Sequence, residues 1–317
     1  IADIDFGKVQ QFTGNYTFWY ESSQLALRQQ SNQNKKAEAR KKELQEFVAR
    51  FSANASKSKQ ATSRKKLIEK INIDDIKPST RRYPGIIFQQ NREAGNDILK
   101  IEGLHFSSDE EKLISDLNVT IEKGDKVAFI SRNSQATTSL FQILVGEKKA
   151  AAGSFTYGQT ITTGYLPSNN DGYFDGKKDL LDWLSDYSPE GMDDADIRGF
   201  LGKMLFTGDD IKKKSNVLSG GEKVRCMLSR IMIIGANLLI IDEPTNHLDL
   251  ESIQAFNNAL INFPGTVLFS SHDHTFTQTV ATRIVELSPS GCIDKMMQYD
   301  DYISSEKVTA QVEALYA

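Results

Sequence analysis

The chain has 317 residues, of which 39% are hydrophobic and 25% charged, and a net charge of −4, ordinary values for a soluble globular protein of about two domains. No apolar run approaches the ~18–20 residues of a membrane-spanning helix, and the N-terminus has no secretory signal pattern. Two cysteines, Cys226 and Cys292, make neither a disulfide framework nor a metal set, so we expect both to be reduced and packed and the protein to be cytoplasmic.

The charge is distributed unevenly along the chain. Residues 21–75 contain thirteen Lys/Arg and seven Asp/Glu, so this segment carries +6 and the remainder about −10. Such asymmetry indicates a specific anionic partner for one segment.

Residues 1–20, IADIDFGKVQQFTGNYTFWY, predict a strand, a glycine turn and a second strand. A similar pattern, IVELSPSGCIDKMMQYDDYI, returns at 284–303. The chain also begins with Ile rather than Met. We therefore expect a fragment that opens with the tail of an earlier copy of the domain with which it closes.

Two helices are predicted next, over residues 18–51 and 61–71, joined by a small, polar and basic stretch at 52–60. Together they predict an antiparallel helical hairpin with a positive tip. The apolar residues of each helix fall on one face: Leu44, Phe47, Val48 and Phe51 in the first, and Leu67, Ile68 and Ile71 in the second.

Basic residues of this hairpin are candidates for contacts to RNA phosphates, which would weaken with salt. Few aromatic residues are interleaved, so nothing indicates base stacking. The alternative is a solvated, charged helix pair without a partner. The candidate RNA-binding residues are Lys57, Lys59, Arg64, Lys65 and Lys66.

Residues 72–97 contain Pro78, Pro84, Gly85 and Gly95 and are interpreted as a connector. From Ile98 onward strands and helices alternate, which predicts an α/β domain with a mainly parallel core sheet and antiparallel additions at each end. The strands are expected at 98–104, 125–130, 162–167, 237–243 and 265–271, and the helices at 137–145, within 178–235 and at 250–262.

The stretch AFISRNSQATTSLFQIL (128–144) has the layout of a phosphate-binding loop: a buried strand, a small-residue turn and an amphipathic helix. A complete loop reads G-x-x-x-x-G-K-[ST]. Here Ser131 and Ala136 stand at the glycine positions and Thr137 at the lysine, so a charge-assisted phosphate contact of about 1.5–3 kcal/mol is lost. The candidate nucleotide-binding residues that remain are Asn133, Thr137, Thr138 and Ser139.

The stretch LSGGEKVRCMLSR (218–230) places Ser219, Gly220 and Gly221 at the start of an amphipathic helix. Glycines let a backbone approach a ligand closely, and unpaired N–H groups at a helix start attract phosphate. An N-cap alone accounts for Ser219 and Glu222, three residues apart, but not for two adjacent glycines.

The stretch LLIIDEP (238–244) is a buried strand that ends in two acids, Asp242 and Glu243. At the carboxyl end of such a strand one acid can hold Mg²⁺ and the next can orient a water for attack on a phosphoryl group. The plain alternative is a strand end with solvated acids. SSHD follows at 270–273, with His272.

These motifs together resemble the ATP-binding-cassette (ABC) family, and EPTNHLDLES resembles its soluble, duplicated, ribosome-associated ABC-F branch. The segment 49–71 is similar to the helical hairpin that joins the two cassettes of that branch. The resemblance implies an α/β, ABC-type nucleotide-binding domain with a P-loop NTPase-like core sheet and antiparallel and helical subdomains, preceded by a helical linker. The implied domains are 1–20, the tail of a missing first cassette; 21–96, the linker; 97–305, the second cassette; and 306–317, a tail.

In this family ATP and Mg²⁺ lie between two cassettes, so the resemblance implies that Ser219 to Glu222 serve the first cassette's nucleotide in trans. It implies metal contacts by Thr138 and Asp242, catalysis by Glu243 with a γ-phosphate contact from His272, and sensing of the partner by Asp249. The family's glutamine is replaced by Ser168, and no aromatic residue stands at 107–112 for adenine; His105 and Phe106 are nearby but poorly placed. The chain's own loop is thus expected to be degenerate, and its retained acids either serve a weakly bound nucleotide or persist structurally.

The implied function is that of an ATP hydrolase acting on the ribosome as a translation factor. Its partners would be the first cassette of the same chain and, through the basic linker, ribosomal and transfer RNA. The isolated fragment is expected to be inactive or very weak. The alternatives are a cassette that regulates a transporter or another partner without chemistry, and a DNA-associated cassette ATPase.

Overall fold

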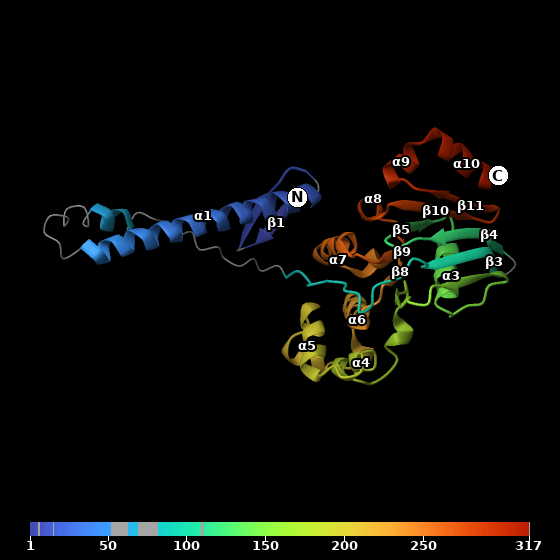
Figure 1. Cartoon of the computed structure of the whole chain (residues 1–317), viewed down its shortest axis with the longest axis horizontal. Helices are drawn as coiled ribbons and strands as arrows, with labels where there is room; N and C mark the ends of the chain where they lie inside the picture. The colour runs from blue at the N-terminus through green and yellow to red at the C-terminus, as the bar shows by residue number, and fades with distance from the viewer. Residues whose placement is uncertain (6, 15, 52–62, 69–81, 109–110, 317) are drawn as a thin grey trace. The chain divides into compact units, whose positions relative to one another are not determined.

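The computed structural model describes residues 1–5, 7–14, 16–51, 63–68, 82–108 and 111–316. The chain divides into two compact units, Ile1–Arg82 and Tyr83–Ala317 (Figure 1). The second unit thus begins before the domain start expected at 97, because Ile86 and Phe88 are buried in its core.

The first unit opens with a β-hairpin that leads into a long helix. β1 (Ala2–Asp5) pairs antiparallel with β2 (Lys8–Gln11), and α1 (Tyr16–Phe51) follows. Trp19 is only 4% exposed, and its ring lies 6.4 Å from that of Phe12 in an edge-to-face arrangement. This contact ties the end of the hairpin to the first turn of α1.

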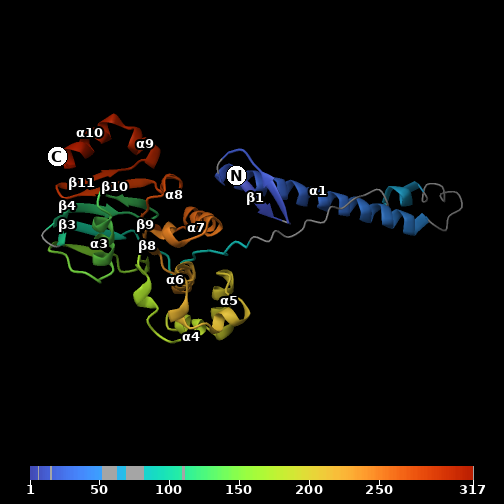
Figure 2. The same cartoon turned by 180° about the vertical axis from the view of Figure 1, so that it is seen from behind.

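The predicted helix at 18–51 is confirmed and begins two residues earlier, at Tyr16. Residues 63–68 are also helical and lie beside the end of α1 (Figures 1 and 2), where the Arg64 guanidinium sits 3.3 Å from the centre of the Phe47 ring. Leu67, on the face where the apolar residues of this helix are expected, is 47% exposed. The rest of the expected hairpin, 52–62 and 69–71, lies outside the described residues.

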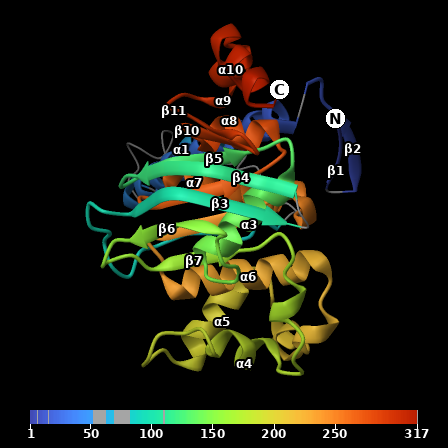
Figure 3. The same cartoon turned by 90° about the vertical axis from the view of Figure 1, so that its right-hand side faces the viewer.

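The second unit contains a six-stranded and a three-stranded sheet (Figure 3). Every neighbouring pair in the larger sheet is parallel except the antiparallel edge strand, and the smaller sheet is antiparallel, which confirms the fold class expected from the sequence. The larger sheet has the order β11 (Gly291–Lys295), β10 (Arg283–Ser288), β5 (Lys126–Ile130), β9 (Thr266–Ser270), β8 (Leu238–Asp242) and β7 (Thr163–Leu166); the smaller has β4 (Glu111–Ile121), β3 (Leu99–Ser108) and β6 (Ala152–Tyr157).

Helix α3 (Ser134–Leu144) is buried between the two sheets, where Leu140 and Phe141 share a core with β3, β4, β5 and β8. A second core lies on the other face of the large sheet, under α6 (Gly220–Ile234) and α7 (Leu250–Asn262). The remaining helices are α4 (Leu180–Ser185), α5 (Asp194–Lys203), α8 (His274–Val280), α9 (Tyr299–Ser304) and α10 (Glu306–Tyr316), with short 3₁₀ turns at Asp171–Tyr173, Gly208–Lys212, Ser215–Val217 and Pro244–His247.

A buried arginine joins three strands at the start of β5. Arg283 donates to Asp125 at 2.8 Å, to the carbonyl of Thr120 at 2.9 Å and to both carboxylate oxygens of Asp294. These partners raise the pKa of Arg283, which therefore stays charged. The network fixes where β5 begins, and so fixes the loop that follows it.

Parallel register brings polar residues together at the carboxyl ends of the large sheet. Asp242 of β8 lies opposite Ser270 of β9, and Ile130 of β5 lies opposite Glu286 of β10. In α/β folds ligands bind outside these strand ends. The turn after β5, the two acids at the end of β8 and the SSHD stretch at the end of β9 therefore lie at one edge of the large sheet.

The expected resemblance between the two ends of the chain has a structural counterpart. β10, β11 and α9 follow one another as an antiparallel hairpin and a helix, in the same order as β1, β2 and α1. Both hairpins turn through a glycine with positive φ, Gly7 and Gly291.

Candidate functional site

The turn between β5 and α3 is closed by its own side chains. Asn133 is the N-cap of α3 and accepts a hydrogen bond from the N–H of Gln135 at 3.0 Å. The N–H of Asn133 in turn donates to the hydroxyl of Ser131 at 3.2 Å, and that of Ala136 donates to the carbonyl of Asn133. Three N–H groups of the turn are thus satisfied within the turn itself, whereas a phosphate loop presents such donors to its ligand.

A fourth donor of this turn is occupied from another element. The N–H of Arg132 donates to the hydroxyl of Tyr316 in α10 at 3.1 Å. Among the described non-glycine residues a positive φ occurs at Asp116, Leu205 and Glu243 and so nowhere in the turn. Its backbone therefore has a conformation that residues with a Cβ adopt without strain.

The residues after the turn divide into buried and accessible ones. Thr137, at the lysine position, is 3% exposed and donates to the carbonyl of Ser134 at 2.8 Å. Ser139 is fully buried, and its hydroxyl accepts from Lys148 at 3.3 Å. Thr138 donates to Asp242 at 2.8 Å. Of the predicted nucleotide contacts in this segment, Thr138 is thus the one hydrogen-bonded to Asp242.

Asp242 is fully buried at the end of β8, with a hydroxyl on each carboxylate oxygen. Thr138 donates to one oxygen, and Ser270, opposite on β9, donates to the other at 2.7 Å. Both bonds are to a carboxylate and are therefore stronger than bonds between neutral groups. The structure brings the predicted metal pair, Thr138 and Asp242, into contact.

Glu243 follows with a left-handed backbone, φ 47° and ψ 56°. Its carboxylate accepts from the N–H of His272 at 3.2 Å, and its other oxygen lies 3.6 Å from the His272 Nε2. An unusual backbone of a non-glycine residue costs energy and often marks a functional position. The contacts between Glu243 and His272 make the two predicted catalytic side chains neighbours.

The environment of Glu243 favours its protonated form. Burial raises the pKa of the carboxyl above its ordinary value, and the charge of Asp242 raises it further. Contacts with His272 oppose this shift. The result is a carboxyl that binds a proton more readily than an exposed glutamate.

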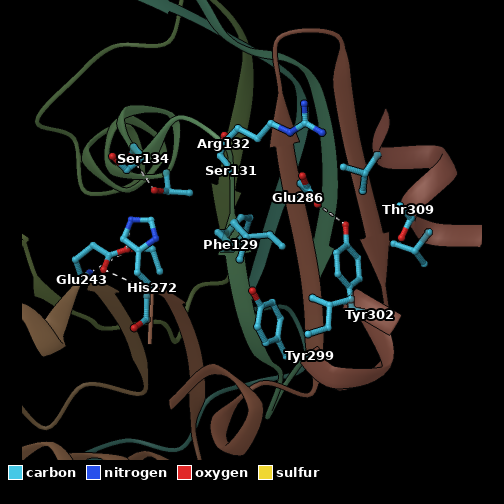
Figure 4. Close-up of a pocket in the computed structure, with 17 residues that line it drawn as sticks. Phe129, Ser131, Arg132, Ser134, Glu243, His272, Glu286, Tyr299, Tyr302 and Thr309 are labelled. Atoms are coloured by element: carbon cyan, nitrogen blue, oxygen red, sulfur yellow. Dashed lines mark hydrogen bonds and ion pairs between the residues drawn. The ribbon is translucent and has the colours of Figure 1, made fainter. Parts of the chain in front are cut away.

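A pocket of about 390 Å³ runs from this pair to α9 and α10 (Figure 4). Ser131 and Arg132 of the turn line it together with Glu243 and His272. Its far side holds a buried carboxylate, Glu286, which accepts from the hydroxyl of Tyr302 at 2.6 Å, and the face of α10 that bears Val308, Thr309 and Val312.

These residues fit Mg²⁺ better than they fit the phosphate chain of ATP. Thr138 and Asp242 have the hydroxyl and carboxylate chemistry of a Mg²⁺ site, and Mg²⁺ commonly keeps several waters beside one or two protein ligands. No group of three His, Cys, Asp or Glu that could hold a metal occurs in the described part of the chain. The turn itself fits a phosphate chain poorly, because four of its N–H groups have acceptors and Thr137 offers no charge.

Residues 219–222 (SGGE), called the signature segment below, form the start of α6. Ser219 and Glu222 make a reciprocal capping box: Ser219 N–H donates to Glu222 at 2.9 Å, and Glu222 N–H donates back to the Ser219 hydroxyl at 3.4 Å. The bond from the Ser219 backbone is the main cause that lowers the pKa of Glu222. Ser219 and Gly220 are exposed, so this helix start is accessible.

The two glycines have different surroundings. A Cβ on Gly221 would lie 3.1 Å from the carbonyl oxygen of His247, whereas one on Gly220 would make only ordinary contacts. Close packing against the 3₁₀ turn Pro244–His247 therefore accounts for Gly221. No such packing accounts for Gly220.

Asp249, farther along the chain, is the N-cap of α7, where it accepts from the N–H of Ser252 at 2.7 Å. It is exposed, and so is the apolar Leu250 beside it. Val217, just before the signature, is 67% exposed. The accessible start of α6 is thus preceded in sequence by the exposed Val217 and followed, at the start of α7, by the exposed Asp249 and Leu250.

The predicted RNA-binding residues are only partly described. Lys65 and Lys66 are exposed, whereas the Arg64 guanidinium is engaged by the Phe47 ring. Lys57 and Lys59 lie outside the described residues.

Sequence reasoning missed two partners of the site. Ser270, which donates a hydrogen bond to Asp242, ends the neighbouring parallel strand. Its position at the end of a predicted strand is the sequence feature that could have indicated this contact. Tyr316, which engages Arg132, lies in what was expected to be a tail, and no local pattern links the two. Val308, 4% exposed, shows that α10 is packed against the cassette.

The fold and the site together define an ABC-type ATP-binding cassette. Its features are a mainly parallel sheet with an antiparallel second sheet, a loop before a buried helix, paired acids at a strand end and a helix that begins with glycines. Two family models described as ABC transporter match the chain, over residues 2–88 and 114–246. The chain therefore belongs to the ATP-binding-cassette family.

Its relatives include "Uncharacterized ABC transporter ATP-binding protein YkpA" of Bacillus subtilis, 56% identical over 100% of this chain and 59% of the relative. "ABC transporter F family member 5" of Arabidopsis thaliana is 27% identical over 99% of this chain and 46% of the relative. "Energy-dependent translational throttle protein EttA" of Escherichia coli is 28% identical over 99% and 57%. The chain thus spans about half to three fifths of these relatives.

Among solved structures, a dimeric ATP-binding cassette described as a post-hydrolysis state bound to ADP and Pi superimposes with a TM-score of 0.53 at 16% identity, covering 63% of this chain and 99% of that chain. This similarity supports the fold alone. Within the described residues no helix is both long and apolar enough to span a bilayer.

Proposed function

We propose that this chain is the C-terminal portion of a duplicated ABC-F ATPase that acts on the ribosome as a cytoplasmic translation factor. It spans only part of each curated relative, and one relative is named as a translational throttle. The hairpin and helix at its start have the same order as those at its end. Both observations support a preceding cassette whose last elements are residues 1–20.

The observation that carries this proposal is the accessible start of α6. Ser219 and Gly220 are exposed, and Gly220 has no packing role. We infer that Ser219 to Glu222 complete the ATP site of the first cassette in trans, with Asp249 and the exposed Leu250 contacting that partner. A helix start with glycines is suited to a phosphate group.

The chain's own loop would contribute little to nucleotide binding. Its four occupied N–H groups and its missing lysine support a degenerate phosphate loop. Thr138 and Asp242 would still hold Mg²⁺, Glu243 would orient or deprotonate a water, and His272 would contact the γ-phosphate. The site would therefore bind nucleotide weakly and hydrolyse it slowly.

Composite binding is tested in the longer protein by sedimentation with ribosomes. With the catalytic glutamates of both cassettes replaced by glutamine, ATP should retain the protein on ribosomes. Adding Ser219→Arg, which fills the signature, should abolish this retention. Ser185→Arg, at an exposed position on α4, is the matched control and should leave it intact. Equal sedimentation with and without ATP would contradict the proposal.

The linker is proposed to contact RNA phosphates through Lys65 and Lys66, with Lys57 and Lys59. Lys65→Gln with Lys66→Gln should weaken ribosome binding and lower its salt dependence. Arg64→Gln should have the smaller effect on binding, because its guanidinium is stacked on Phe47. Binding that is unchanged at every salt concentration would remove the linker from the proposed function.

A second candidate is a regulatory module without chemistry, and the occupied loop favours it. Such a module, for example a transporter-coupling subunit, would not require Glu243 and would purify with a membrane protein. Ribosome binding that depends on ATP and on Ser219 separates the two candidates.

A further inference from the structure

The end of α10 is fastened to the turn between β5 and α3 by one side chain. The Tyr316 hydroxyl accepts from the N–H of Arg132 at 3.1 Å and donates to the carbonyl of Leu287 in β10 at 2.8 Å. The Arg132 guanidinium lies over the Tyr316 ring, 4.1 Å from its centre. One tyrosine thus binds both the backbone donor and the cation of Arg132.

Arg132 differs from the neighbouring donors of the turn. The N–H groups of Asn133, Gln135 and Ala136 have acceptors within 131–133, so they are satisfied by the turn itself. The acceptor for Arg132 comes from a helix more than 180 residues later. Movement of α10 alone would free this N–H and the guanidinium.

Helix α10 also walls the pocket that contains the catalytic pair. Val308, Thr309 and Val312 line it. Thr309 lies across the pocket from Glu243 and His272 (Figure 4). Val308 is 4% exposed, so the first turn of α10 is anchored, while Tyr316 holds its last turn. The helix thus borders the pocket at one end and holds the turn at the other.

We propose that α10 is an autoinhibitory latch, in which Tyr316 withholds Arg132 from the phosphate chain of a nucleotide. Released, Arg132 supplies the positive charge that Thr137 cannot, since arginine binds phosphate through several fixed donors. The proposal rests on the proposed function only in placing a nucleotide at this turn.

Titration of the 317-residue chain with trinitrophenyl-ATP, displaced by pyrophosphate, tests the latch. Tyr316→Ala should tighten binding about tenfold, because a competing contact of this kind lowers the competent fraction by about that factor. Tyr316→Phe, which keeps the ring and loses the hydroxyl, should give a smaller gain. Adding Arg132→Ala to Tyr316→Ala should remove the gain. Binding no tighter in Tyr316→Ala than in the parent chain overturns the proposal.

Amide hydrogen exchange provides a readout that needs no nucleotide. In Tyr316→Phe the N–H of Arg132 should exchange several-fold faster, whereas Phe129 in the adjacent strand should be unchanged. Equal exchange at Arg132 in both proteins would show that Tyr316 is no latch. Neither experiment involves ribosomes or a first cassette, so failure of the latch and failure of the translation role are separate outcomes.

Discussion

The carboxylate of Glu243 and the imidazole of His272 are neighbours, with 3.6 Å between an oxygen of the first and the Nε2 of the second. The glutamate side chain is only 10% exposed, whereas that of the histidine is 74% exposed. One partner is therefore held in the protein and the other faces the open pocket.

Replacing Glu243 by glutamine should stabilise the protein at high pH and change little at low pH. The folded-state pKa of Glu243 is raised, so the folded chain binds more protons than the unfolded chain between the ordinary pKa near 4.5 and the raised one. Stability therefore falls as pH rises through that window, and Glu243→Gln removes this loss. We expect the variant's Tm to exceed the parent's by about 2–4 °C at pH 8 and by much less at pH 4, measured by calorimetry.

Glu190→Gln, at an exposed position, is the control and should leave the Tm difference near zero at both pH values. A gain from Glu243→Gln that is equal at pH 4 and pH 8 would show that burial of the charge is not its cause.

The 317-residue chain should show negligible ATP turnover. If two copies paired head to tail, each resulting site would use the loop that lacks a lysine and has four of its N–H groups occupied. Phosphate release measured with malachite green should stay at the level of a blank. Robust release that Glu243→Gln abolishes would contradict both the degenerate loop and the need for a first cassette.

Alanine should affect stability differently at the two signature glycines. Gly220→Ala meets only ordinary contacts and should stabilise the helix by about 0.5–1 kcal/mol, the usual advantage of alanine over glycine in a helix. Gly221→Ala places a Cβ 3.1 Å from the carbonyl of His247 and should lose that gain or destabilise the protein. Thermal unfolding followed by circular dichroism measures the Tm of both variants. Equal changes in Tm would show that the 3₁₀ turn moves away from the added Cβ at little cost.

Removing the buried arginine should be among the costliest single changes in the second unit. Arg283→Met leaves Asp125 buried without its cation and should cost about 3–5 kcal/mol. Arg283→Lys keeps the charge but cannot bind Asp125 and Asp294 with the same fork, so an intermediate loss is expected. Urea unfolding by circular dichroism measures both. A loss below about 1 kcal/mol in Arg283→Met would mean that water replaces the network.

The sequence predicts most of this fold because its strands are strongly apolar and its helices begin at recognisable caps. The helix expected at 250–262 is observed over those residues, capped by Asp249. The helix expected at 137–145 begins earlier, at Ser134, because the Asn133 side chain caps it there.

Parts of the candidate site could not be predicted because they depend on contacts between distant segments. The pair of Asp242 with Thr138 follows from the motif, whereas its bond to Ser270 follows from the strand register. The contact between Arg132 and Tyr316 joins a turn to a helix that was expected to be a tail. Tertiary packing, not local propensity, decides such partners.

Helix α3 is stabilised by its position between the two sheets, where Leu140 and Phe141 are fully buried, and this stabilisation needs no ligand at its first residues. Substitutions upstream of those anchors can therefore accumulate without unfolding the domain. The residues of this turn can therefore change while the sheets and helices of the domain keep their arrangement.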